Sequence, residues 1–124
     1  MMMIYGIGID ITEIARFRKM AEKQRLTLFA QKVLTPNEYE IFMGLTGIRA
    51  LEFIAGRFSA KESYSKALGT GIGSAVTFQD LEILKNQATG QPIITKHPRE
   101  EEMKAFISIS HTQDVVMTEV ILEL

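Results

Sequence analysis

The sequence predicts an α+β domain in which an antiparallel sheet packs against about three helices. Three observations lead to this class. Residues 3–10 form an apolar, β-branched run typical of a strand, residues 12–68 show helical periodicity, and strand-like patterns occupy most of 76–123. A run of helices followed by a run of strands is typical of α+β domains.

The opening strand, Met-Ile-Tyr-Gly-Ile-Gly-Ile-Asp, contains two glycines, which indicate a close approach of another backbone. Thr12 is predicted to cap a first helix, with Glu13 in its first turn. The tetrapeptide 35–38, Thr-Pro-Asn-Glu, has the form of a capping box and starts a second helix that ends near Gly44.

A longer helix is predicted over 48–68, because Ile48, Leu51, Ile54 and Phe58 recur at helical spacing. Either of two following glycines, Gly69 or Gly71, is expected to end it in the left-handed conformation.

The second half of the chain is predicted to be mainly strand. Residues 76–85 are β-rich, and the turn 86–90 leads into a strand over 92–95, as in a hairpin. Residues 98–102 are predicted to form one or two helical turns. Two final strands, 105–110 and 115–123, are joined by a short turn.

Length and composition indicate one globular domain, 1–124, with 46% hydrophobic and 23% charged residues. A net charge of −1 argues against general nucleic-acid binding, which needs a strongly basic surface. The chain has no cysteine and no apolar run near the roughly 20 residues of a membrane span. The first residues lack the features of a signal peptide, so we expect a cytoplasmic protein without a membrane partner.

Residues 57–66, Arg-Phe-Ser-Ala-Lys-Glu-Ser-Tyr-Ser-Lys, end the long predicted helix and precede a glycine-rich bend. Arg57 and Lys61 are four residues apart, as are Glu62 and Lys66, so each pair shares a helix face. Several cations beside one carboxylate suit a polyphosphate with a divalent metal, because the metal lets the carboxylate approach the phosphates. The alternative is an ordinary exposed ion pair between Glu62 and Lys66, worth about 0.3–0.5 kcal/mol.

Three elements stand out together: Asp10 at a strand end, the 57–66 helix with its glycine bend, and the run Ser-Ile-Ser-His-Thr at 108–112. In this order they resemble the 4′-phosphopantetheinyl transferases, and among these the small holo-acyl-carrier-protein synthase type. The matching segments are IYGIGIDITEI (4–14), VLTPNE (33–38), EFIAGRFSAKE (52–62), KALGTGIG (66–73), GQP (90–92) and SISHT (108–112). The resemblance covers nearly the whole chain.

The resemblance implies a 4′-phosphopantetheinyl transferase-like fold and a Mg²⁺-dependent transferase of fatty acid biosynthesis. Such an enzyme moves the 4′-phosphopantetheine arm of coenzyme A to a serine of apo acyl carrier protein and leaves adenosine 3′,5′-bisphosphate. It implies Asp10 and Glu62 as metal ligands, with Lys66 and Lys61 stabilising charge on the pyrophosphate. The base that accepts the serine proton is either a metal-bound water or Glu62.

For the nucleotide, the resemblance implies that Arg57 and His111 hold the ribose 3′-phosphate. Thr112, Gly69, Gly71 and Pro92 complete the cradle. Each residue also has a purely structural interpretation: Asp10 as a helix-start residue, His111 as a turn residue and the glycines as a helix end. His97 matches no motif and is expected at the surface.

The segment 16–32 carries six basic residues against one glutamate, a charge that would attract an acidic protein. Given the resemblance, its expected partner is acyl carrier protein, bound by Arg16, Lys19, Lys23 and Arg25. A solvated helix face is the alternative. The resemblance further implies a homotrimer with each site at a subunit boundary.

Two other function classes remain open: a non-catalytic coenzyme A- or nucleotide-binding protein of the same fold, and a small module that binds acidic proteins. The chain departs from the family pattern at 92–106, which is short and acidic, and at 115–119, which is bulkier than usual. The first departure affects the length of an element there, and the second affects core or subunit packing.

Overall fold

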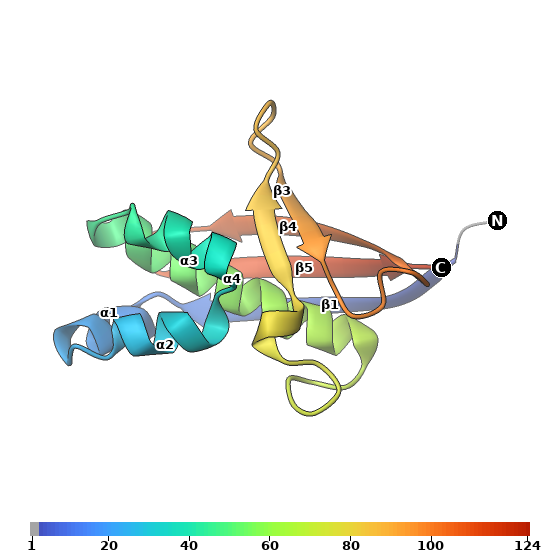
Figure 1. Ribbon diagram of the computed structural model, residues 1–124, viewed down its shortest axis with the longest axis horizontal. Helices are drawn as coiled ribbons and strands as arrows, with labels where there is room; N and C mark the ends of the chain where they lie inside the picture. Colours follow the sequence, from blue (N-terminus) through green and yellow to red (C-terminus); the bar gives the residue numbers. More distant parts are fainter. Residues whose placement is uncertain (1–2) are drawn as a thin grey trace.

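The computed structural model describes residues 3–124 and has the predicted α+β architecture (Figure 1). In chain order the elements are β1 (Ile4–Glu13), α1 (Ala15–Glu22), α2 (Leu26–Val33), α3 (Pro36–Met43), α4 (Gly47–Leu68), a 3₁₀ turn η1 (Phe78–Asp80), β2 (Glu82–Lys85), β3 (Pro92–Lys96), β4 (Lys104–His111) and β5 (Val115–Glu123).

The main sheet has three antiparallel strands in the order β1-β5-β4. The register pairs Asp10 with Thr118 and places Ile109 on the other side of the same residue. Strands β2 and β3 form a separate two-stranded antiparallel hairpin, whose turn projects from the body of the molecule (Figure 1).

Helix α4 runs along the sheet and packs against β1 and β5 (Figure 1). Two glycines of β1 make this packing possible. A Cβ atom on Gly8 would lie 1.9 Å from the Ser63 carbonyl oxygen, and one on Gly6 would lie 1.9 Å from that of Ala67. Only residues without a side chain allow the strand and helix backbones to approach so closely.

The core has two parts, one along each half of α4. Helices α1, α2 and α3 gather over the first half, where Phe17, Val33 and Phe58 are buried together. The second half packs Tyr64 and Ala67 against the sheet and the loop before β2. The outer face of the main sheet, by contrast, is apolar and exposed, with Ile7, Ile9, Ile11, Phe106 and Met117 between 47% and 64% accessible.

Several predicted elements are confirmed. The capping box is present, with Thr35 accepting from the Glu38 amide and Glu38 accepting from the Thr35 amide. Helix α4 ends at Gly69, whose φ of +92° is the predicted left-handed conformation. The hairpin and the last two strands lie where the sequence pattern indicates.

The structure differs from the sequence predictions in several places. Strand β1 continues to Glu13, so Thr12 is a strand residue rather than a helix cap. A further helix, α2, lies over Leu26–Val33. Within 76–85 only Glu82–Lys85 is strand. Residues 98–102 form turns, and the Met103 amide donates to the Arg99 carbonyl at 2.9 Å, which corresponds to a single helical turn.

His97 was also misplaced, since it is 7% exposed and its Nδ1 lies 2.8 Å from the Tyr64 hydroxyl. No helix within residues 3–124 is long and apolar enough to cross a membrane.

Candidate active site

The carboxylates of Asp10 and Glu62 line one hollow of about 550 Å³, which we call the carboxylate hollow. Asp10 comes from β1 and Glu62 from the middle of α4; Thr12, Arg16 and Phe58 line the same space. Lys66, one turn after Glu62, donates to Asp10 Oδ1 at 3.2 Å and to the Ile9 carbonyl at 3.1 Å. The structure therefore brings together the three residues predicted to be catalytic.

A buried polar seam between α4 and the sheet fixes the strand that carries Asp10. The Ser59 hydroxyl bonds the Thr118 hydroxyl at 2.8 Å and donates to the Asp10 carbonyl at 3.4 Å. Ser63 bonds the same Thr118 hydroxyl at 2.6 Å. Sequence reasoning missed this seam, although Ser59 and Ser63 are spaced one helical turn apart and could have been identified as one face.

The side chain of Asp10 is oriented by Thr12, whose hydroxyl donates to Oδ2 at 2.6 Å. Burial and the nearby Asp10 carboxylate raise the pKa of Glu62, which Lys66 and Arg16 only partly offset. Two carboxylates that repel each other across one hollow form a site where a cation is stabilising.

Arg16 is exposed but lies against an aromatic cluster at the edge of this hollow. Its guanidinium carbon is 4.7 Å from the centre of the Phe58 ring and 5.7 Å from that of Phe17. Such a stack restrains the charged group beside the carboxylates. Lys19, Lys23 and Arg25 are exposed on and just after α1 and do not line the hollow.

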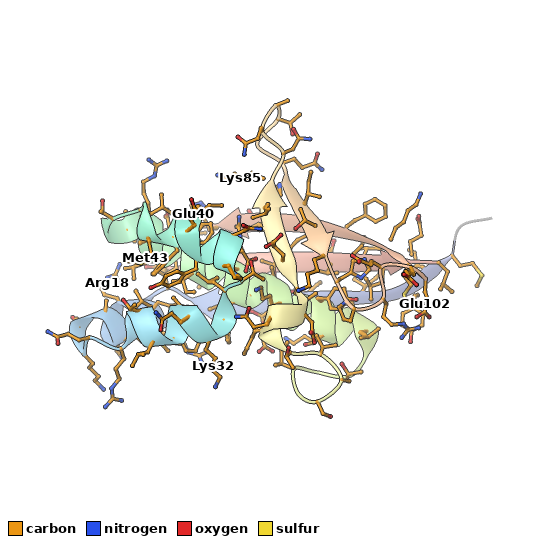
Figure 2. The ribbon with its side chains drawn as sticks, viewed as in Figure 1. Arg18, Lys32, Glu40, Met43, Lys85 and Glu102 are labelled. Atoms are coloured by element: carbon orange, nitrogen blue, oxygen red, sulfur yellow. The ribbon has the colours of Figure 1, made fainter. Side chains whose placement is uncertain are left out.

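A second depression of about 360 Å³ lies beside the first half of α4 and contains several cations. We call it the basic hollow; Arg49, Arg57, Lys85 and His111 line it, together with Glu52, Phe53, Gly90 and Pro92. Figure 2 shows Lys85 on β2, below the projecting turn of the hairpin. Three predicted nucleotide contacts, Arg57, Pro92 and His111, thus meet in one place.

Sequence reasoning missed Arg49, Lys85 and Glu52 in this hollow. Arg49 had a signal, because Arg49, Phe53 and Arg57 recur every four residues on one helix face. No sequence pattern indicated Lys85, because its position depends on how the β2–β3 hairpin folds back. Glu52 lies 3.6 Å from His111 Nδ1 and balances part of the positive charge.

Arg57 is 5% exposed, and its guanidinium stacks 4.3 Å above the centre of the Phe53 ring. Its Nε donates to the Ile83 carbonyl at 2.9 Å. Burial lowers the pKa of Arg57, and the Glu38 charge partly restores it. The group remains a cation at neutral pH, because arginine starts far above that range.

Lys61 does not belong to the site, which corrects the prediction that it stabilises the pyrophosphate. Its side chain is 0% exposed and donates to Glu38 Oε1 at 2.6 Å. It also donates to the carbonyls of Val33 at 2.7 Å and Phe78 at 3.0 Å. These three acceptors use the three donors of the ammonium, so none is left for a ligand.

The remaining predicted nucleotide residues line neither hollow within the described chain. Gly69 and Gly71 have positive φ, and their amides bond the Ser65 carbonyl as a helix cap. Thr112 closes the turn between β4 and β5 by accepting from the amides of Asp114 and Val115. The predicted helix end at Gly69 is confirmed, and contact of these three residues with a nucleotide stays a prediction.

The two hollows share no lining residue. Arg57 and Glu62 are five positions apart, which corresponds to about 140° around an α-helix. The carboxylates and the nucleotide-type cations of one chain therefore lie on different sides of α4.

Residues 6–120 match the model of the 4′-phosphopantetheinyl transferase superfamily. The holo-[acyl-carrier-protein] synthase of Levilactobacillus brevis is 59% identical over 98% of this chain and 95% of its own length. That of Ligilactobacillus salivarius is 55% identical over 98% of this chain and 88% of its own.

Two solved structures agree in fold. The synthase of Bacillus anthracis in complex with coenzyme A (3′,5′-ADP) has a TM-score of 0.86 and 45% identity, and the match covers 98% of this chain and 97% of that one. The Helicobacter pylori enzyme in complex with coenzyme A has a TM-score of 0.78 and 32% identity over 94% and 98% of the two chains. Sequence, fold and the grouping of Asp10, Glu62 and Lys66 agree, and this chain belongs to the 4′-phosphopantetheinyl transferase superfamily.

Proposed function

We propose that the protein is a holo-acyl-carrier-protein synthase. It transfers 4′-phosphopantetheine from coenzyme A to a serine hydroxyl of apo acyl carrier protein and releases adenosine 3′,5′-bisphosphate. The observation that carries the proposal is that Asp10 of β1 and Glu62 of α4 line one hollow, with Lys66 bonded to Asp10. The names of the similar enzymes support the choice of substrates.

Asp10 and Glu62 would hold a Mg²⁺ ion. Two carboxylates fit this ion, which commonly takes one or two protein carboxylates and fills its other positions with phosphate oxygens and water. Within residues 3–124 no cluster of three or more His, Cys, Asp or Glu side chains could form a metal site, so the remaining ligands would come from substrate and water. When bound, the ion would supply positive charge to the pyrophosphate and its leaving oxygen.

We assign the remaining roles in the reaction to individual side chains. The serine oxygen attacks the phosphorus that bears the pantetheine arm, and the bond to the bridging pyrophosphate oxygen breaks. Lys66, 51% exposed and paired with Asp10, would place its ammonium beside the departing phosphate. We assign the serine proton to Glu62, whose carboxylate borders the hollow and whose pKa is raised by burial and by the Asp10 carboxylate.

We assign nucleotide binding to the basic hollow. Arg57 and His111 would hold the ribose 3′-phosphate, with Arg49 and Lys85 adding charge from neighbouring walls. Stacking on Phe53 keeps the Arg57 guanidinium in one orientation, which lowers the entropy lost on binding. Pro92 lines the hairpin side of the hollow. Gly69, Gly71 and Thr112, which line neither hollow, would contact the nucleotide through backbone and hydroxyl groups.

Subunit assembly would join the two kinds of hollow. The exposed apolar face of the main sheet, formed by Ile7, Ile9, Ile11, Phe106 and Met117, is a surface that a second copy would cover. A homotrimer, as the family resemblance implies, would place the basic hollow of one subunit opposite the carboxylate hollow of the next. This arrangement explains why one chain separates Arg57 from Glu62.

The acceptor protein would dock on α1, where Arg16, Lys19, Lys23 and Arg25 are exposed. Acyl carrier proteins are acidic, and opposite charges raise the rate of encounter. Arg16 is the residue of this set that borders the carboxylate hollow, so it connects docking with the reacting serine.

The deciding experiment incubates the protein with coenzyme A, Mg²⁺ and apo acyl carrier protein and follows the carrier by intact mass. We expect a gain of one phosphopantetheine group and an equal amount of adenosine 3′,5′-bisphosphate. A protein that binds coenzyme A in calorimetry but leaves the carrier mass unchanged would instead be a binding protein of this fold.

A further inference from the structure

The carboxylate of Glu38 is the centre of a buried network that the proposed reaction does not use. Its side chain is 0% exposed, and it lines neither hollow. Oε1 accepts from the Thr35 amide at 2.9 Å and from Lys61 Nζ at 2.6 Å. Oε2 accepts from the Ile83 amide at 2.7 Å. The last bond reaches from α3 to β2, 45 residues further along the chain.

Ile83 is held from its other side by Arg57, which donates to the Ile83 carbonyl at 2.9 Å. One residue of β2 is thus bonded by two charged side chains of opposite sign, Glu38 on its N–H and Arg57 on its C=O. Ile83 pairs with Ile94 of β3, so this clamp fixes the whole hairpin against α4.

The clamped hairpin forms one wall of the basic hollow. Lys85, two residues after Ile83, lines that hollow, as do Gly90 and Pro92. The Arg57 guanidinium, which lines it from α4, has its Nε occupied by the same clamp. Any shift of Ile83 would therefore move both the arginine and the lysine that face the ligand.

A contribution to the stability of the fold does not by itself explain why a charged Glu38 side chain is buried here. Burying a charged pair costs desolvation, and apolar residues of similar size often serve the fold equally well. Here the Glu38 charge also acts on a ligand-facing group, because it opposes the effect of burial on the pKa of Arg57. The network has both a geometric and an electrostatic connection to the basic hollow.

We propose that Glu38 is a positioning residue for the nucleotide. Its carboxylate, bonded to Ile83, sets the position of Arg57 and of the β2–β3 hairpin, and so determines how tightly the 3′-phosphate of coenzyme A is held. This inference rests on the proposed function, in which the basic hollow binds that phosphate. Glu38 itself touches no substrate.

The test uses the full chain and two variants. Glu38→Met/Lys61→Met removes both charges of the buried pair together, so neither member of the pair is left without the other. Glu38→Asp keeps the charge but shortens the reach to Ile83. Circular dichroism and thermal melting establish which variants fold, and kinetics are then measured with coenzyme A and with 3′-dephospho-coenzyme A as donors.

We expect the double variant to raise KM for coenzyme A about tenfold or more, a magnitude typical of a lost charge-assisted contact, with kcat within about twofold of the parent. KM for the dephospho donor should change little, so the preference for the 3′-phosphate collapses. Glu38→Asp should give a smaller shift in the same direction. Equal changes for both donors, or an unchanged KM for coenzyme A in a folded variant, would overturn the proposal.

Tyr64→Phe provides the matched control. It lies on the same helix, about two turns beyond Arg57, and loses one buried hydrogen bond, to His97, which is not part of the Glu38 network. Its donor preference should equal that of the parent. If the parent itself does not modify the carrier, the proposed function fails, and calorimetric affinities for coenzyme A and its dephospho form then decide the Glu38 proposal by the same criterion.

Discussion

Arg57 and Glu62 lie on the same helix, five residues apart, yet Arg57 lines the basic hollow and Glu62 the carboxylate hollow. A single coenzyme A molecule carries its 3′-phosphate and its pyrophosphate on the same ribose, at the 3′ and 5′ oxygens. In the proposed reaction, the residues that serve these two groups contact one ligand. The homotrimer that we propose would bring the basic hollow of one copy beside the carboxylate hollow of another.

Mixing two inactive variants tests this shared site. We expect Asp10→Asn and Arg57→Gln to be nearly inactive alone but to recover activity after co-refolding, because a site can then take its carboxylates from one subunit and its cations from the next. Random equal mixing in a head-to-tail ring restores roughly one quarter of the sites. Activity that stays at the level of the separate variants would place each complete site within one chain.

Loss of either carboxylate should abolish carrier modification. We expect Asp10→Asn and Glu62→Gln each to reduce kcat/KM by about 10²-fold or more, the scale of losing electrostatic stabilisation at a reacting phosphate. Glu13→Gln is the control, because Glu13 lines the same hollow but is an exposed residue at the end of β1. Carrier modification at the normal rate in either Asp10→Asn or Glu62→Gln would refute the assigned site.

Reversing the charge of Arg16 should weaken docking of the carrier. We expect Arg16→Glu to raise the KM for apo acyl carrier protein about tenfold at low salt, with less effect at high salt, where screening shortens the range of the field. Lys96→Glu, an exposed reversal on β3, should leave that KM unchanged. A KM for the carrier that does not respond to Arg16→Glu contradicts the docking surface.

The sequence predicted those elements whose signals are local. Thr35 and Glu38 lie within one turn, and Gly69 ends α4 by its own conformational freedom, so both helix boundaries were correct. Asp10, Glu62 and Lys66 were brought together by resemblance to a family rather than by any local pattern.

The remaining features depend on distant partners. Helix α2 has no side-chain cap at Arg25, so nothing in its sequence marked its start. Thr12 can cap a helix, but pairing of Thr12 with Val116 keeps it in the strand. Lys61 has the spacing of a phosphate-binding lysine, and only Glu38, 23 residues earlier in the chain, shows that it is buried.

Acid should destabilise the fold through His97. Burial lowers the pKa of His97, which is bonded to Tyr64, so the folded state favours the neutral imidazole. The stabilisation is present above the ordinary histidine pKa of about 6.5 and is lost as the pH falls towards the lower folded pKa. We expect the melting temperature of the parent to fall as the pH drops below about 6.5, and that of His97→Gln to fall less. Parallel pH profiles for the two proteins would contradict this role.

Adding one methyl group at Gly8 of β1 should disrupt the site, although Gly8 contributes no side chain to it. In Gly8→Ala the new Cβ would lie 1.9 Å from the Ser63 carbonyl oxygen. Because both partners are backbone, neither can move aside without disturbing its strand or helix. Strand β1 must then move away from α4, which separates Asp10, two residues along, from Glu62 and Lys66. We expect a loss of stability of about 3 kcal/mol or more, in the range of severe overpacking, measured by urea unfolding. Gly73→Ala, where a Cβ meets nothing within 4 Å, is the matched control and should unfold as the parent does. Equal stability of the two variants would mean that strand and helix do not make this close contact, and the position assigned to Asp10 would have to be abandoned.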